Sequence, residues 1–156
     1  MLKSRMLKKL FAPANDSFGI SLALLILRLW VGLTMLLNHG VGKLKDFSHL
    51  SGDFPDPFHI GHAGSLALVV FAEVVASLLL VTGLVTRFAA VLLAINMAVA
   101  FFMAHNHSLS GSHSGELAFI YLAAYVTLFF AGPGRMSLDK SVFGGSGGKA
   151  KSPAKD

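Results

Sequence analysis

The feature that most constrains this chain is a series of four apolar stretches, each bounded by polar residues, glycine or proline. They cover residues 18–38, 64–84, 87–104 and 115–131. Each is therefore roughly 17–21 residues long, and about 20 helical residues cross the hydrocarbon core of a bilayer. The composition agrees, because 54% of the residues are hydrophobic and 13% are charged. Without the alternation typical of barrel strands, these stretches predict an all-α integral membrane four-helix bundle.

The segments outside the apolar stretches divide the chain into three parts. Residues 1–17 carry four basic side chains and an apolar face, which predicts a short interfacial helix at the membrane surface. Residues 18–143 hold the predicted transmembrane domain. Residues 144–156 are rich in glycine, serine and lysine, which predicts a disordered tail.

The basic residues predict the orientation of the bundle. They gather in the N-terminal arm, at Arg87 and in the C-terminal segment, whereas residues 105–114 contain no Lys or Arg. By the positive-inside rule both termini are cytoplasmic, and the expected location is the cytoplasmic (inner) membrane of a bacterium. The two connections that carry all seven histidines then face outward together. The net charge of +5 forms no basic and aromatic groove, so a nucleic-acid partner is not expected.

Three polar residues lie deep in the first three apolar stretches. Arg28, Glu73 and Asn96 all fall near the middle of the bilayer when counted at about 1.5 Å per residue. An unpaired charge at this depth costs about 3 kcal/mol or more. We therefore expect Arg28 to pair with Glu73, with Asn96 as a hydrogen-bonding neighbour. Such a pair either locks helix packing or takes part in a proton or quinone-headgroup relay.

A second polar group is expected at the external mouth of the bundle. His39 ends the first apolar stretch, and Lys43 lies one turn beyond it if the helix continues. His105 ends the third stretch and Glu116 begins the fourth. These side chains suit proton transfer or contact with a substrate, because neutral imidazole titrates near physiological pH. Ordinary roles at helix ends are the alternative.

The connection after the third stretch also offers ligands for a metal ion. His105, His107 and His113 present imidazole nitrogens of the kind that bind Zn or Cu, although their spacing matches no strong metal-binding pattern. Exposed loop histidines without a metal are the alternative. Because the chain has no cysteine, any redox role needs a bound cofactor, a metal or a partner.

The ordered set of these residues resembles the DoxX family of small bacterial membrane proteins. The resemblance covers roughly residues 22–143, and its most specific element is the ending Gly132–Asp139. The other elements are Leu27-Arg28 with Gly32, His39-Gly40, Gly42-Lys43, Glu73, the turn Thr82–Arg87, His105 and Glu116. The resemblance implies a four-helix integral membrane protein. It also implies a link to sulfur and thiosulfate:quinone redox systems, or to membrane oxidoreductase complexes that handle oxidative stress.

The combined expectation is a subunit of a membrane redox system. In this hypothesis Arg28, Glu73 and Asn96 contact a quinone or a small oxidised substrate. Protons or an anion arrive from outside by way of His39, Lys43, His105 and Glu116. The expected partners are the lipid bilayer, an oxidoreductase and further copies of the chain. A non-catalytic scaffold or accessory subunit is the main alternative, and a small-solute channel or carrier is a third.

Overall fold

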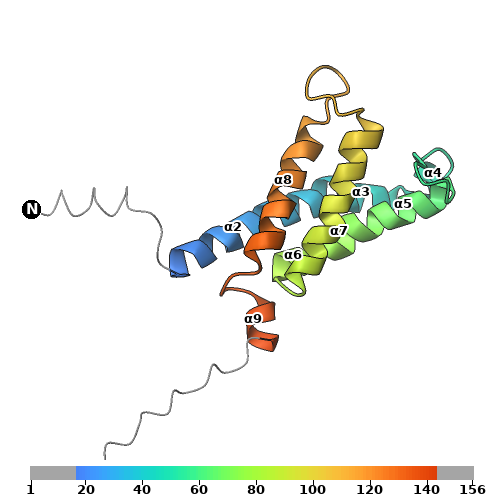
Figure 1. Cartoon of the computed structure of the whole chain (residues 1–156). Coiled ribbons are helices and arrows are strands. Elements are labelled where there is room, and N and C mark those ends of the chain that lie inside the picture. The colour runs from blue at the N-terminus through green and yellow to red at the C-terminus, as the bar shows by residue number, and fades with distance from the viewer. Residues whose placement is uncertain (1–16, 144–156) are drawn as a thin grey trace, which may run out of the picture.

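The computed structural model describes residues 17–143, and every regular element in this range is helical (Figure 1). The predicted interfacial helix and the predicted tail lie outside the described residues. The elements are α2 (Ser17–Met35), η1 (Leu36–Gly40), α3 (Val41–Lys45), α4 (Phe47–Leu50), α5 (His62–Val70), η2 (Phe71–Ala76), α6 (Ser77–Thr82), α7 (Thr86–Val99), η3 (Ala100–Ala104), α8 (Glu116–Ala131) and α9 (Leu138–Val142), where η marks π-helical segments.

Consecutive elements join into long apolar helices. Three of them, in the described part of the chain, are long and apolar enough to cross a membrane: Phe18–Lys45, His62–Thr82 and Thr86–Ala104. The fourth predicted span appears as the shorter apolar helix α8, of 16 residues. The chain is therefore a helical protein compatible with a membrane bundle, in which the predicted stretches are recognisable as helices.

The first helix continues beyond its predicted end at Asn38. The sequence Gly40-Val41-Gly42 is typical of a helix terminus, yet the chain stays helical through Lys45. Gly40 is needed for a different reason: a Cβ atom there would lie 2.8 Å from the carbonyl oxygen of Glu73. The absence of a side chain thus lets η1 approach η2 closely, and the extra turns carry Lys43 along the second helix.

The helices form two antiparallel hairpins that pack across each other (Figure 1). The first consists of α2–α3 beside α5–α6, and the second consists of α7–η3 beside α8. Their contact buries Met35, Leu80, Leu93, Tyr125 and Leu128 completely. The outer faces carry many exposed apolar side chains, as expected of surfaces that contact lipid.

The segment after α8 returns along one end of the bundle. Helix α8 ends at Ala131, as the sequence Gly132-Pro133-Gly134 predicts. The carboxylate of Asp139 then accepts hydrogen bonds from the backbone N–H groups of Val85 (2.7 Å) and Thr86 (2.9 Å). Because these groups lie at the start of α7, Asp139 caps that helix and ties the C-terminal segment to it.

Candidate functional site

Arg28 does not pair with Glu73 as predicted. Its side chain is fully buried and donates to the carbonyl oxygens of Leu80, at 3.4 Å, and Met136. The carboxylate that acts on it electrostatically belongs to Asp139. Arg28 therefore joins the second helix to the C-terminal segment.

The wrong pairing follows from a wrong register between the first two helices. The prediction matched the midpoints of two spans of equal length, with Arg28 opposite Glu73. The first helix instead runs on to Lys45, and it packs on the second helix with Gly32 against Val81 and Gly40 against Glu73. Gly40 and Lys43 consequently lie against Glu73.

Lys43, Glu73 and Asn96 form a compact polar cluster between three helices. The Nζ atom of Lys43 lies 2.7 Å and 2.9 Å from the two carboxylate oxygens of Glu73. Asn96 donates a further hydrogen bond to Glu73 at 3.3 Å, which confirms the predicted contact between these two residues. The side chain of Glu73 is 4% exposed and that of Lys43 is 25% exposed. The cluster therefore holds a buried anion beside a partly accessible cation.

The π-helical segments lie around this polar cluster. Glu73 belongs to η2, and Gly40 of η1 packs on its backbone. Ala100, Met103 and Ala104 of η3 line the cavity into which the cluster opens. Such segments are rare and recur at functional sites, since they displace side chains from regular helical positions. Their position favours a functional role for this part of the bundle.

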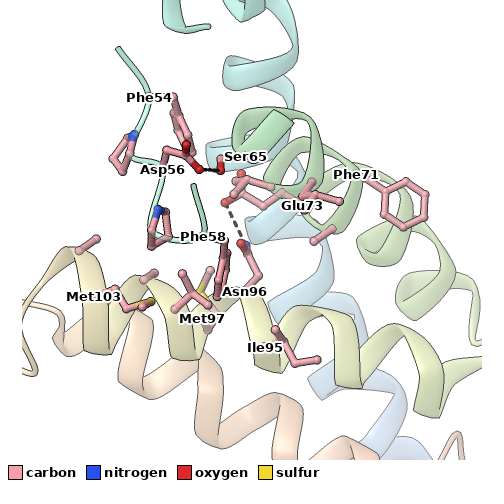
Figure 2. A pocket seen from close by; sticks show the side chains of 18 of the residues that line it. Phe54, Asp56, Phe58, Ser65, Phe71, Glu73, Ile95, Asn96, Met97 and Met103 are labelled. Atoms are coloured by element: carbon pink, nitrogen blue, oxygen red, sulfur yellow. Dashed lines mark hydrogen bonds between the residues drawn. The ribbon is translucent and has the colours of Figure 1, made fainter. Parts of the chain in front are cut away.

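A cavity of about 650 Å³ adjoins the polar cluster (Figure 2). It lies between the second and third helices and beneath part of the loop that joins α4 to α5. Most of its lining is apolar. The polar side chains that line it are Lys43, Asp56, Ser65, Glu73 and Asn96. An apolar space of this size with a few polar groups is typical of a small-molecule site.

The loop over the cavity, residues 51–61, is held in place by Asp56. Its carboxylate accepts hydrogen bonds from the hydroxyl of Ser65 (2.6 Å) and the backbone N–H groups of Gly61 (2.8 Å) and Ile60 (3.0 Å). The hydrogen bond from Ser65 is the largest cause that lowers the pKa of Asp56 below its ordinary value of 3.8. The loop is therefore latched to the first turn of α5 whenever Asp56 is ionised.

Sequence reasoning missed the contribution of this loop to the site. Phe54, Pro55, Pro57 and Phe58 line the cavity together with Asp56, and Figure 2 shows Phe58 beside Asn96 and Met97. The only local signal is the sequence Phe-Pro-Asp-Pro-Phe, in which aromatic residues flank prolines in a segment between two helices.

His39 lies near the cluster but packs against another helix. Its half-buried ring makes an edge-to-face contact with Tyr121, with ring centroids 6.1 Å apart. The Tyr121 hydroxyl donates to the Thr34 hydroxyl at 2.8 Å, which joins α8 to the first helix. His39 is one helical turn before Lys43, as predicted, and it does not line the cavity.

The other predicted mouth residues lie in and beside the connection between η3 and α8. The Nδ1 atom of His105 lies 3.1 Å from the carbonyl oxygen of His113, and the ring of His107 lies against Phe102. Glu116 is exposed at the start of α8. In the described residues, neither His105 nor Glu116 contacts the polar cluster.

The proposed metal site at His105, His107 and His113 is not assembled. Residues 17–143 contain no group of three or more His, Asp or Glu side chains placed to hold a metal ion. The physical reason is the path of the connection, because the backbone of Asn106 and His107 turns through positive φ angles of 46° and 50°. The ring of His105 consequently meets the backbone carbonyl of His113, and the ring of His107 lies against Phe102, so these side chains do not form a group that could hold a metal ion.

The sequence comparisons identify the family to which the chain is related. Residues 23–106, which include the whole polar cluster, match the DoxX family. The chain belongs to the DoxX family. A Haemophilus influenzae protein described as uncharacterized is 34% identical over 118 residues, which cover 70% of this chain and 83% of the relative. A second uncharacterized protein of that organism is 29% identical over 133 residues, with coverage of 81% and 87%. No solved structure matches this DoxX-family chain.

Proposed function

We propose that this DoxX-family protein is a subunit of a membrane redox system and binds a quinone in the cavity beside Glu73. The observation that carries the proposal is the polar cluster of Lys43, Glu73 and Asn96 in the wall of an otherwise apolar cavity of about 650 Å³. Buried polar groups orient a small molecule while the apolar lining contributes most of the contact area. A quinone combines the same two features, since its ring carries two carbonyl groups and its substituents are apolar.

The hydrogen-bonding capacity of the cluster fits both redox forms of such a ring. Lys43 has three N–H donors, and two contacts with Glu73 leave one donor for a ligand. Asn96 gives one N–H to Glu73 and keeps its carbonyl oxygen and a second N–H. A quinone carbonyl would accept from Lys43 or Asn96, and a quinol hydroxyl would donate to Glu73.

A partner oxidoreductase supplies or removes the electrons in this proposal. Interconversion of quinone and quinol moves two electrons and two protons, and the chain has no cysteine with which to carry electrons. We assign to this chain the binding and orientation of the ring. We also propose a bacterial inner-membrane location with both termini in the cytoplasm, on the basis of the distribution of basic residues. His39, His105 and Glu116 would then lie toward the outer side and exchange protons with it.

The experiment is equilibrium binding of a quinone to the protein in lipid nanodiscs. Replacing Asn96 with leucine removes hydrogen-bonding groups from the cavity wall without changing any charge. We expect quinone binding to weaken about tenfold, which corresponds to one lost hydrogen bond of about 1 kcal/mol or slightly more. Asn38→Leu is the matched control, because Asn38 is exposed and does not line the cavity.

Two results would contradict this function. One is the absence of saturable quinone binding to the wild-type protein, and the other is equal binding by the Asn96→Leu and wild-type proteins. If a partner enzyme also co-purifies with a folded Glu73→Gln variant and retains its activity, the accessory-scaffold function replaces the proposed one.

A further inference from the structure

We infer that the cavity takes its ligand sideways from the hydrocarbon layer of the membrane, through the gap between helices 62–82 and 86–104. The ligand class is an amphiphile with a hydrogen-bonding head at the polar cluster and an apolar chain that remains in the gap. This inference rests on the proposed function, because it specifies which quinones the site accepts: those with a hydrocarbon chain.

The rim of the cavity is made of side chains that also belong to the apolar outer surface. Leu68, Phe71, Ile95 and Met103 line the cavity, yet they are 58%, 48%, 56% and 51% exposed. They lie on two helices that are apolar and long enough to span a membrane. An opening framed by such residues on a membrane-spanning surface faces lipid. Its apolar rim offers no hydrogen-bonding partners to water.

The polar groups lie at the inner end of the same space. Figure 2 shows Phe71 and Ile95 directed away from the centre of the cavity, whereas Glu73 and Asn96 meet within it. A molecule that reaches Glu73 from the rim therefore passes along hydrocarbon before it meets a charged group. This order of surfaces matches a polar head followed by an apolar chain.

The route from the loop end of the bundle is covered. Phe54 and Phe58 line the cavity from the loop, and Figure 2 shows Phe54 beside the contact of Asp56 with Ser65 and Phe58 beside Asn96. The carboxylate of Asp56 accepts from Ile60 and Gly61 within the loop and from Ser65 in the first turn of α5, and the bond from Ser65 holds the loop on that helix. A water-soluble molecule must displace this latched loop, whereas a molecule in the bilayer meets no such barrier.

The absence of cysteine from the natural chain allows a direct test of the entry route. Ala72→Cys introduces one thiol in the cavity wall, next to Glu73. The protein in nanodiscs is treated with two maleimides, one carrying an octyl chain and one carrying a sulfonate. The ratio of their rates at the same thiol measures the route, because the reactivity of that thiol affects both reagents equally.

Two control positions calibrate the ratio. Leu78→Cys places a thiol on the exposed apolar face away from the cavity, and Ser110→Cys places one in the exposed connection before α8. The octyl preference is the rate of the octyl maleimide divided by the rate of the sulfonated maleimide at the same thiol. We expect the octyl preference at Ala72→Cys to equal that at Leu78→Cys. It should exceed the preference at Ser110→Cys by about a hundredfold, because the apolar chain concentrates the reagent in the bilayer. A preference at Ala72→Cys equal to that at Ser110→Cys would overturn the inference.

Opening the loop should change the reaction rate of only one of the two maleimides. In the Ala72→Cys background, Asp56→Asn weakens the latch, so the sulfonated maleimide should react about tenfold faster while the octyl reagent keeps its rate. Equal acceleration of both reagents would mean that the loop is the common entrance, and would reject lateral entry.

Ligand protection separates this inference from the proposed function. A quinone with an isoprenoid chain should protect Ala72→Cys from the octyl maleimide, and a quinone without the chain should protect it at least about tenfold less at equal total concentration. Equal protection by both quinones would reject the role of the chain while supporting quinone binding. A strong octyl preference with no protection by either quinone would support the lateral opening and refute the quinone as its ligand.

Discussion

The ion pair between Lys43 and Glu73 predicts that two single substitutions lower the free energy of unfolding by different amounts. Both oxygens of the carboxylate lie within 2.9 Å of the ammonium, but the Glu73 side chain is only 4% exposed and the Lys43 side chain is 25% exposed. Lys43→Met leaves a buried carboxylate with Asn96 as its remaining side-chain partner. Glu73→Gln leaves an ammonium near the end of a helix, where a flexible side chain can turn toward water. Lys43→Met should therefore lower the free energy of unfolding more than Glu73→Gln does.

The burial of the two side chains sets the magnitudes. Removing one partner of a buried ion pair costs about 3–5 kcal/mol, and we expect Lys43→Met to lie near about 3 kcal/mol because its cation is partly exposed. Glu73→Gln should cost about 1 kcal/mol, since the cation that remains regains solvent. The double variant removes both charges and should also lose about 1 kcal/mol, which gives a coupling energy of about 3 kcal/mol.

The assay is reversible unfolding by sodium dodecyl sulfate in mixed micelles, followed by far-ultraviolet circular dichroism. The free energy of unfolding is measured for the wild-type protein, both single variants and the double variant at neutral pH. Lys45→Met is the matched control, because Lys45 is exposed on the same short helix and should have no effect on stability. Equal losses in the two single variants, or a coupling energy below about 0.5 kcal/mol, would refute the reasoning.

Three further predictions concern the C-terminal segment, the loop and the histidine-bearing connection. Gly83→Ala should cost at least about 2 kcal/mol in the same unfolding assay, because Gly83 has a φ angle of +72° and its Cβ would lie 2.0 Å from Nη1 of Arg28. The protection factors for hydrogen exchange of the Ile60 and Gly61 amides, which donate to Asp56, should stay constant from neutral pH down to about pH 4 and fall below it. The lowered pKa of Asp56 makes its stabilising contribution complete above the ordinary value of 3.8, and protonation removes that contribution at lower pH. Replacing His105 and His107 with alanine should leave the metal content of untagged protein unchanged by elemental analysis; loss of one metal ion per chain would contradict the observed arrangement.

The contact of Glu73 with Asn96 was predictable from the sequence, whereas the ion pair of Glu73 with Lys43 was not. Glu73 and Asn96 stand out because an ionisable or amide side chain inside an apolar span is costly without a partner, and the structure joins them by a hydrogen bond. The partner of Glu73 was predicted wrongly as Arg28, because sequence distance along two helices does not reveal their relative register. Lys43 was expected at the external mouth, and its contact with Glu73 depends on the continuation of the first helix.

The role of the loop was beyond sequence reasoning for a different reason. Asp56 lies six positions before the first residue of α5, which is too far for an ordinary N-terminal cap and so gives no local signal. Its carboxylate accepts hydrogen bonds from Ser65 and Gly61 because the loop folds back over the start of the helix. Phe58 reaches the cavity through the same fold.

The sequence by itself determined that the chain is helical, rich in membrane-length apolar segments and a member of the family it resembles. The helical and apolar character of the segments is a local property. Hydropathy over about 20 residues reports the cost of burying a segment in hydrocarbon, whatever its neighbours are. Only the tertiary structure decided which polar side chains meet. A glycine such as Gly40 can end a helix or allow two helices to touch, and the choice depends on the surface that packs against it. In the observed register Gly40 lies against the backbone of Glu73, and Lys43, and not Arg28, meets the Glu73 carboxylate.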